Sequence, residues 1–211
     1  MVRVPIDPLA PDCEALAKAA GVLARGGVVA YPTDTLYGLA VDPRKPAAVE
    51  ALYRIKGREP GEPIALIAAS SAQVEARVGR LSDLERRLAR QFWPGPLTLV
   101  IAAAPSLAQV LHSLNGRVAV RVPAHAVAAG LAALIDHPVT STSANRSGQP
   151  APAVADDIGR WLMDAIDLVL DGGPAPGGPP STVVDTSGPA PVLVRAGAVP
   201  WERVLESLHR A

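Results

Sequence analysis

Short apolar runs alternate with amphipathic stretches along most of the chain. The runs are three to five residues long and rich in Val, Leu and Ile, which is typical of buried strands. Strands are predicted at Val28–Ala30, Ile64–Ala68, Leu97–Ile101, Val118–Val122, Pro138–Thr140, Leu168–Leu170, Thr182–Val184 and Val192–Arg195. Because Val118–Val122 shows no polar face, we expect it inside the sheet.

Stretches with apolar residues three and four positions apart predict helices between these strands. They run over Asp12–Arg25, Ala47–Lys56, Ser82–Phe92, Ser106–His112, His125–Ile135, Asp156–Ala165 and Trp201–His209. Since strands and helices interleave throughout, the predicted fold class is α/β with a mixed sheet. We find neither an internal repeat nor a sharp change in composition, so one domain over residues 1–211 is predicted.

Caps and breakers set the predicted ends of these elements. Asp12 can cap the first helix, and Ser82 with Glu85 has the spacing of a capping box. Pro32 is expected to end the pairing of the first strand, because proline has no N–H for a ladder. Pro5–Pro11 is read as a polar lead-in, and Gly172–Pro180 as a segment without regular structure.

Composition narrows the function classes. About half of the 211 residues are hydrophobic and the net charge is zero, so a large core is expected and a sequence-independent nucleic-acid binder is disfavoured. Cys13 is the only cysteine, which excludes an intrachain disulfide, and we expect it to be buried. Without a long apolar run or a signal-peptide pattern, a cytoplasmic protein with no membrane contact is predicted.

Several common motifs are missing. The sequence has no P-loop, no dinucleotide fingerprint, no H-E-x-x-H and no G-x-S-x-G elbow. The four histidines are scattered, which favours surface or capping roles over metal binding. No side-chain metal site is predicted.

Hydroxyls and cations instead gather in loops that follow strands. They are Thr33 with Thr35, Lys56 with Arg58, the segment Thr140–Asn145, Ser181 with Thr182, and the strand-ending Arg121 and Arg195. Arg matches phosphate oxygens with a planar fork and Lys adds a point charge. From the residues alone we therefore predict an anion-binding α/β enzyme that uses a nucleotide.

Seven motifs in order resemble the YrdC/Sua5 family of threonylcarbamoyl-AMP synthases. They are Tyr31–Gly38 (YPTDTLYG), Lys56–Arg58 with Pro63 following, Pro94–Thr98, Val120–Pro123, Ser143–Gly148, Ser181–Asp185 and Arg195–Gly197. They span residues from about 20 to 200, and the chain resembles the short, single-domain YrdC-like form rather than the longer Sua5 type.

This resemblance implies a twisted, open α/β sheet with a concave basic face. It implies synthesis of L-threonylcarbamoyladenylate and pyrophosphate from L-threonine, bicarbonate and ATP, with Mg²⁺ carried on the ATP phosphates. The product would pass to a separate transferase complex that modifies position 37 of tRNA, and a weak direct contact with tRNA is left open.

The resemblance also implies residue roles. ATP would be bound by Lys56, Arg58, Ser143, Asn145 and Arg195, with Lys56 and Arg58 positioning and stabilising charge. L-threonine would be bound by Thr33, Thr35, Arg121, Ser141 and Ser181, with Arg121 on the carboxylate. Asp34 is expected to act from outside the first layer of contacts rather than as a base, and no general base is assigned.

One departure and two alternatives remain at this point. Ile64–Ile67 lacks a histidine that many Sua5-type members carry after the Lys-x-Arg loop, so its contacts are not transferred. The alternatives are an RNA-binding module without catalysis, and a carbamoyl-handling enzyme like the hydrogenase-maturation carbamoyltransferases. Scarce aromatics argue against the first, and the lack of a Cys-rich segment argues against the second.

Overall fold

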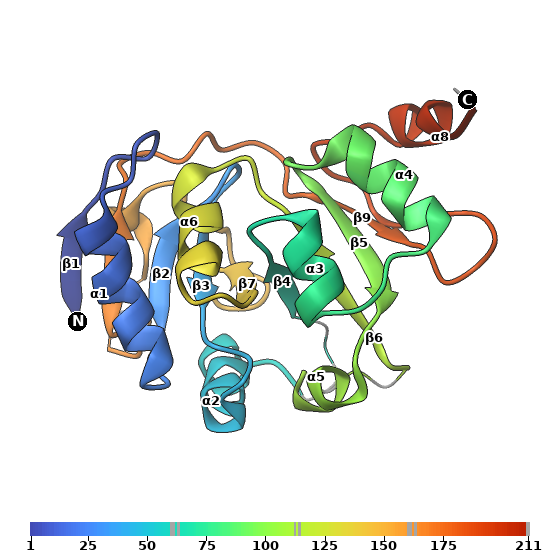
Figure 1. The fold of residues 1–211 in the computed structure, drawn as a ribbon. Coiled ribbons are helices and arrows are strands. Elements are labelled where there is room, and N and C mark those ends of the chain that lie inside the picture. Colours follow the sequence, from blue (N-terminus) through green and yellow to red (C-terminus); the bar gives the residue numbers. More distant parts are fainter. Residues whose placement is uncertain are drawn as a thin grey trace.

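The computed structural model describes residues 1–59, 62, 64–111, 113, 115–159, 162 and 164–209. Its strands form a single ten-stranded mixed sheet in the order β1-β8-β2-β3-β7-β4-β6-β5-β9-β10, with helices packed on it (Figure 1). This confirms the predicted α/β class with a mixed open sheet.

The strands are β1 (Val2–Pro5), β2 (Val29–Pro32), β3 (Tyr37–Ala40), β4 (Ala65–Ile67), β5 (Leu97–Ala102), β6 (Arg117–Arg121), β7 (Val139–Ser143), β8 (Leu168–Asp171), β9 (Thr182–Asp185) and β10 (Val192–Arg195). The helices are α1 (Cys13–Ala24), α2 (Pro46–Lys56), α3 (Ser71–Arg77), α4 (Asp83–Phe92), α5 (Pro105–Val110), α6 (Ala126–Leu134) and α8 (Trp201–His209), with a 3₁₀ turn at Ala155–Asp157.

Two hydrophobic cores lie on the two faces of the sheet. Val29 and Tyr31 of β2 pack in the core that contains α1 and α6, whereas Ala30 between them packs in the other core, with α2 and α4. This division follows from the alternation of side chains along a strand. Helices α1 and α6 contact each other and cover only part of their face, as Figure 1 shows. The uncovered part of that face is where the site described below lies.

The predicted helix starts are confirmed in detail. The Asp12 carboxylate accepts the Ala15 N–H at 2.7 Å. At α4, Ser82 Oγ accepts the Glu85 N–H at 3.3 Å while Glu85 accepts the Ser82 N–H at 2.6 Å, so the capping box is complete. Most other predicted elements agree with the structure to within one or two residues.

Replacing Ser82 with alanine is expected to lower the free energy of unfolding by about 1 kcal/mol, because the Glu85 N–H loses its acceptor. Denaturant unfolding monitored by circular dichroism measures this loss. Ser106→Ala, at an exposed serine in the first turn of α5, serves as the control. An equal effect of the two substitutions would contradict the capping role.

One prediction about local structure was wrong, and the structure adds elements that were not predicted. The lead-in Pro5–Pro11 is preceded by strand β1, which was not predicted and which pairs in parallel with β8. Strand β2 ends at Pro32 as predicted, although Pro32 itself still stands opposite Tyr37 in the β2–β3 hairpin. Cys13 is exposed on the first turn of α1 rather than buried. In addition, α3 was not predicted; Ser70 caps it by accepting the Gln73 N–H at 3.1 Å.

Some predicted segments include residues outside the described ranges. They are Pro60, Gly61 and Pro63 of the loop after α2, His112 after α5, and Arg160, Trp161 and Met163 of the predicted Asp156–Ala165 helix. Within the described ranges, none of the helices is both long and apolar enough to cross a bilayer.

Candidate active site

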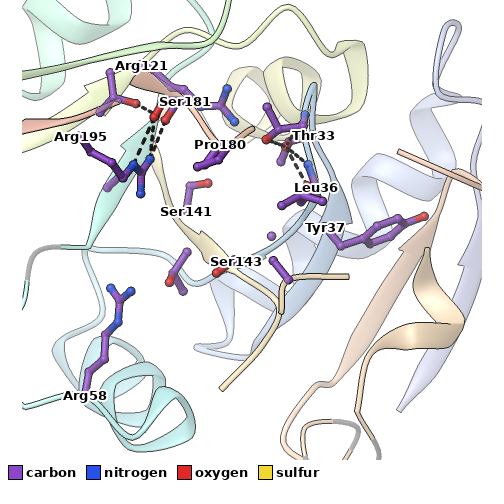
Figure 2. Close-up of a pocket in the computed structure, with 16 residues that line it drawn as sticks. Thr33, Leu36, Tyr37, Arg58, Arg121, Ser141, Ser143, Pro180, Ser181 and Arg195 are labelled. Carbon is purple, nitrogen blue, oxygen red and sulfur yellow. Dashed lines mark hydrogen bonds between the residues drawn. The ribbon is translucent and has the colours of Figure 1, made fainter. Parts of the chain in front are cut away.

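A cavity of about 380 Å³ opens on the sheet face that α1 and α6 leave uncovered. Its volume is in the range of small-ligand sites. The lining comes from the β2–β3 turn, the chain after α2, strands β3 to β7, the segment before β9 and the end of β10 (Figure 2). The lining residues are Thr33, Thr35, Leu36, Tyr37, Gly38, Arg58, Ala65, Thr98, Arg121, Ser141, Thr142, Ser143, Ala151, Pro180, Ser181 and Arg195.

Strand register explains why these polar side chains share one face. Ile67, in the core with α1 and α6, stands opposite Arg121 on β6 and opposite Val139 on β7. Partners across a ladder point to the same face, and so do residues two apart along a strand. Ser141 and Ser143 therefore follow Val139 on this face, and Arg121 joins them from the neighbouring strand.

The β2–β3 turn presents one threonine to the cavity and uses the other internally. The hydroxyl of Thr33 donates to Leu36 O at 2.8 Å and accepts the N–H groups of Thr35 and Leu36 at 3.2 and 3.3 Å. Thr33 thus stabilises the turn by side chain to backbone bonds. The Thr35 hydroxyl lies 3.2 Å from that of Thr33, and both residues are buried in the cavity wall.

Three arginines give the cavity its charge. Arg58 follows α2, Arg121 ends β6 and Arg195 ends β10, and all three line the cavity. Burial, together with repulsion from Arg121 and Arg58, lowers the pKa of Arg195. This repulsion indicates that the three guanidinium groups lie near one another, as expected for a site that binds an anion. Among the described lining residues none is acidic.

Arg195 is held by Ser181. Its guanidinium donates to Ser181 O at 2.8 and 3.3 Å and to Ser181 Oγ at 3.2 Å, as Figure 2 shows. The Ser181 hydroxyl also lies 2.8 Å from the Thr98 hydroxyl, and both residues are buried. These bonds connect β10 to the start of β9 and to β5, and fix one wall of the cavity.

Arg121 is paired with Asp34. Arg121 Nη1 donates to Asp34 Oδ1 at 2.6 Å, and the two side chains are 7% and 13% exposed. Asp34 belongs to the β2–β3 turn but is not among the lining residues. The structure thus places Asp34 behind Arg121, outside the cavity lining.

Lys56 lies beneath the cavity wall rather than in it. Its ammonium donates to Ser143 O at 2.5 Å, to Asn145 O, and to Asn145 Oδ1 at 3.1 Å. The residue is 1% exposed and is absent from the lining. Burial and the nearby Arg58 lower the pKa of Lys56 to about 7. Lys56 therefore ties the end of α2 to the segment that follows β7.

That segment is fixed by further bonds. Ser143 Oγ donates to Asn145 Oδ1, and Asn145 Nδ2 donates to Gln149 O. The Ser147 N–H donates to Lys56 O at 3.2 Å, and Arg58 Nε donates to Ser147 Oγ at 3.3 Å. The Lys-x-Arg and Ser-x-Asn motifs, far apart in sequence, form one hydrogen-bonded unit.

Eight of the ten predicted binding residues line the cavity: Thr33, Thr35, Arg58, Arg121, Ser141, Ser143, Ser181 and Arg195. Lys56 and Asn145 do not line it, and reach it only through Ser143 and the segment described above. Thr98 and Tyr37 line it without having been assigned a role. Both belong to motifs quoted above, which indicated the segment. The motifs did not indicate that these two side chains point into the cavity.

The fold and the cavity together define an α/β protein with a basic cavity lined by hydroxyl side chains. The protein-family model for Sua5, YciO and YrdC, described as telomere recombination, matches residues 21–197. The chain belongs to this family.

Individual relatives support the same family assignment. A threonylcarbamoyl-AMP synthase of Pyrococcus abyssi is 37% identical over 186 residues, which cover 88% of this chain and 55% of that protein. A threonylcarbamoyl-AMP synthase of Thiobacillus denitrificans is 42% identical over 163 residues, covering 77% of this chain and 86% of that protein. The crystal structure of P. abyssi Sua5 complexed with L-threonine superposes with a TM-score of 0.91 at 33% identity, covering 99% of this chain and 61% of that one. The chain thus spans little more than half of the archaeal relative and most of the bacterial one.

Proposed function

We propose that this chain is a threonylcarbamoyl-AMP synthase, a nucleotidyltransferase acting in tRNA modification, with its activity carried by one domain over residues 1–211. Its substrates are L-threonine, bicarbonate and ATP, and its products are threonylcarbamoyl-AMP, pyrophosphate and water. The observation that carries this proposal is the single cavity in which three arginines face hydroxyl side chains, in a member of a family whose relatives bear this name.

The residues divide between two substrates. Thr35, Arg121, Ser141 and Ser181 bind L-threonine, with the guanidinium of Arg121 on its carboxylate. Thr33 acts in that set by holding the turn. Arg58, Arg195 and Ser143 bind the phosphates of ATP, and Lys56 with Asn145 acts mainly by fixing the Ser143 segment.

The chemistry needs positioning and charge stabilisation more than covalent catalysis. The neutral amine of threonine takes up bicarbonate to form a carbamate and release water. A carbamate oxygen then attacks the α-phosphorus of ATP, and the bond to the β-phosphate oxygen breaks to release pyrophosphate. Arg58 and Arg195 stabilise the charge that collects on the phosphate oxygens.

The site fits Mg²⁺ that is bound mainly through the phosphates of ATP. The described lining residues offer no carboxylate, Asp34 is occupied by Arg121, and no cluster of three or more His, Cys, Asp or Glu is found among the described residues. Mg²⁺ is commonly bound through substrate phosphates and water, which requires no such cluster. When bound, it would neutralise phosphate charge.

The product is handed to a separate tRNA threonylcarbamoyl transferase complex, and the reaction takes place in the cytoplasm. Both statements follow from the activity proposed above. The experiment below also measures whether the protein binds tRNA directly.

Purified protein incubated with ATP, Mg²⁺, bicarbonate and L-threonine is expected to release pyrophosphate. The release should depend on both threonine and bicarbonate, with serine and bicarbonate-free buffer as controls. Pyrophosphate release measured with a coupled enzyme assay checks this. If no release occurs while tRNA binds in a salt-sensitive manner, the protein is an RNA-binding module and the proposal is wrong.

A further inference from the structure

The pairing with Asp34 distinguishes Arg121 from the other two arginines that line the cavity. Arg121 contacts the carboxylate of Asp34 at 2.6 Å, and the two side chains are only 7% and 13% exposed. The second oxygen of Asp34 accepts the Ala124 N–H at 3.4 Å, so the carboxylate links the β2–β3 turn to Arg121 and to the chain after β6. Such a pair is screened less than an exposed one.

The two other arginines have different surroundings. Arg195 donates to the carbonyl and hydroxyl oxygens of Ser181, which carry no net charge. Arg58 lies 3.7 Å from Glu62, whose side chain is 51% exposed, so water weakens that attraction. Figure 2 shows Arg58 and Arg195 on one side of the cavity and the β2–β3 turn with Thr33 across from them. Asp34 therefore offsets the charge of Arg121, whereas the Ser181 oxygens offset none of the charge of Arg195.

Two further titratable groups lie beside this pair, and neither changes its charge near neutral pH. Burial lowers the pKa of His125, Asp34 opposes this shift and Arg121 adds to it, and the net lowering favours the neutral imidazole. Burial raises the pKa of Tyr31 to about 12, so its phenol is neutral as well. The charge around this pair is therefore set by Asp34 and Arg121 themselves.

We propose that Asp34 is a specificity-determining residue whose carboxylate cancels the charge of Arg121, so that the adjoining subsite accepts an amino-acid carboxylate and rejects multiply charged phosphates. This rests on the proposed function, since it assumes that threonine and a triphosphate share the cavity. An unpaired guanidinium would bind phosphate at least as well as carboxylate. Because Coulomb energy scales with the charge of the ligand, one added negative charge repels pyrophosphate several times more strongly than a monocarboxylate.

The test compares the binding of inorganic pyrophosphate and of L-threonine to the wild type and to Asp34→Asn by titration calorimetry. Asparagine keeps the size and an oxygen acceptor for Arg121 and removes the charge. Its affinity for pyrophosphate should rise by roughly tenfold while its affinity for threonine changes by roughly threefold or less. Pyrophosphate should displace threonine from the variant and leave threonine bound in the wild type.

Asp42→Asn is a matched control. Asp42 is a buried aspartate that pairs with Arg44 at 2.8 Å, and neither residue lines the cavity. It removes the same charge from the protein as a whole and should leave both affinities unchanged. If thermal melting shows that Asp34→Asn is unfolded, Asp34→Ser takes its place, because serine is a common turn residue and also removes the charge.

The outcomes separate the inference from the proposed function. Displacement of threonine by pyrophosphate in the wild type would overturn the role of Asp34, and so would an unchanged preference in Asp34→Asn. In both cases threonine still binds and the proposed function stands. A wild-type protein that binds no L-threonine would instead overturn the proposed function, and this inference with it.

Discussion

Arg58→Ala is expected to lower turnover by on the order of a hundredfold, because a preorganised cation that stabilises charge on the transferred phosphate is lost. Arg58 lines the cavity after the end of α2, and its Nε donates to Ser147 Oγ at 3.3 Å. Pyrophosphate release at saturating ATP measures the effect on turnover, and its dependence on ATP concentration separates a loss of turnover from a loss of binding.

Arg54→Ala is the matched control for this substitution. Arg54 lies in the last turn of the same helix, is exposed and does not line the cavity. The control should keep near-normal turnover, and both variants should melt close to the wild type. Near-normal turnover in Arg58→Ala itself would remove the phosphate role assigned to this residue.

Lys56→Met is expected to affect stability and turnover together. Without the ammonium, Ser143 O and Asn145 O lose a buried donor, which costs about 1–3 kcal/mol of the free energy of unfolding. Turnover should fall by roughly a hundredfold or more, since small displacements of positioning groups have effects of this size. Lys45→Met, at the exposed N-cap of the same helix, should change neither.

The pH dependence identifies Lys56 as the cause. In the unfolded chain a lysine keeps its proton up to its ordinary pKa of 10.5, whereas the folded protein releases it near 7. Between these values the unfolded state holds more protons, so this group makes stability rise with pH and removes that gain as pH falls toward 7. Denaturant unfolding across this range should show a steeper rise in the wild type than in Lys56→Met. Parallel curves would contradict the lowered pKa.

The sequence predicted the fold class and most elements because local signals were strong. The capping box at Ser82 and the cap at Asp12 act within a few residues, so they can be recognised without knowledge of distant contacts. In contrast, β1 is a four-residue edge strand ending in Pro5, and its only sheet partner, β8, is more than 160 residues away. Nothing local distinguishes it from a loop.

The sequence predicted which residues form the site better than it predicted how their side chains are arranged. Motifs identified the segments that meet at the cavity, and eight assigned residues line it. They did not reveal that Lys56 turns away toward two carbonyl groups, because that direction depends on where β7 ends relative to α2. Likewise, the pairing of Asp34 with Arg121 depends on strand order, which brings residues 87 positions apart into contact.

The walls of the cavity come from nearly the whole length of the chain, from Thr33 near the start to Arg195 near the end. During synthesis on the ribosome, the hydroxyl-bearing wall emerges long before β9 and β10 supply Ser181 and Arg195. A chain that lacks these strands has an incomplete cavity, so a ligand that contacts the whole cavity would stabilise the finished chain more, because a ligand stabilises only the state that binds it. Such a ligand would protect finished copies from proteases and leave incomplete copies exposed.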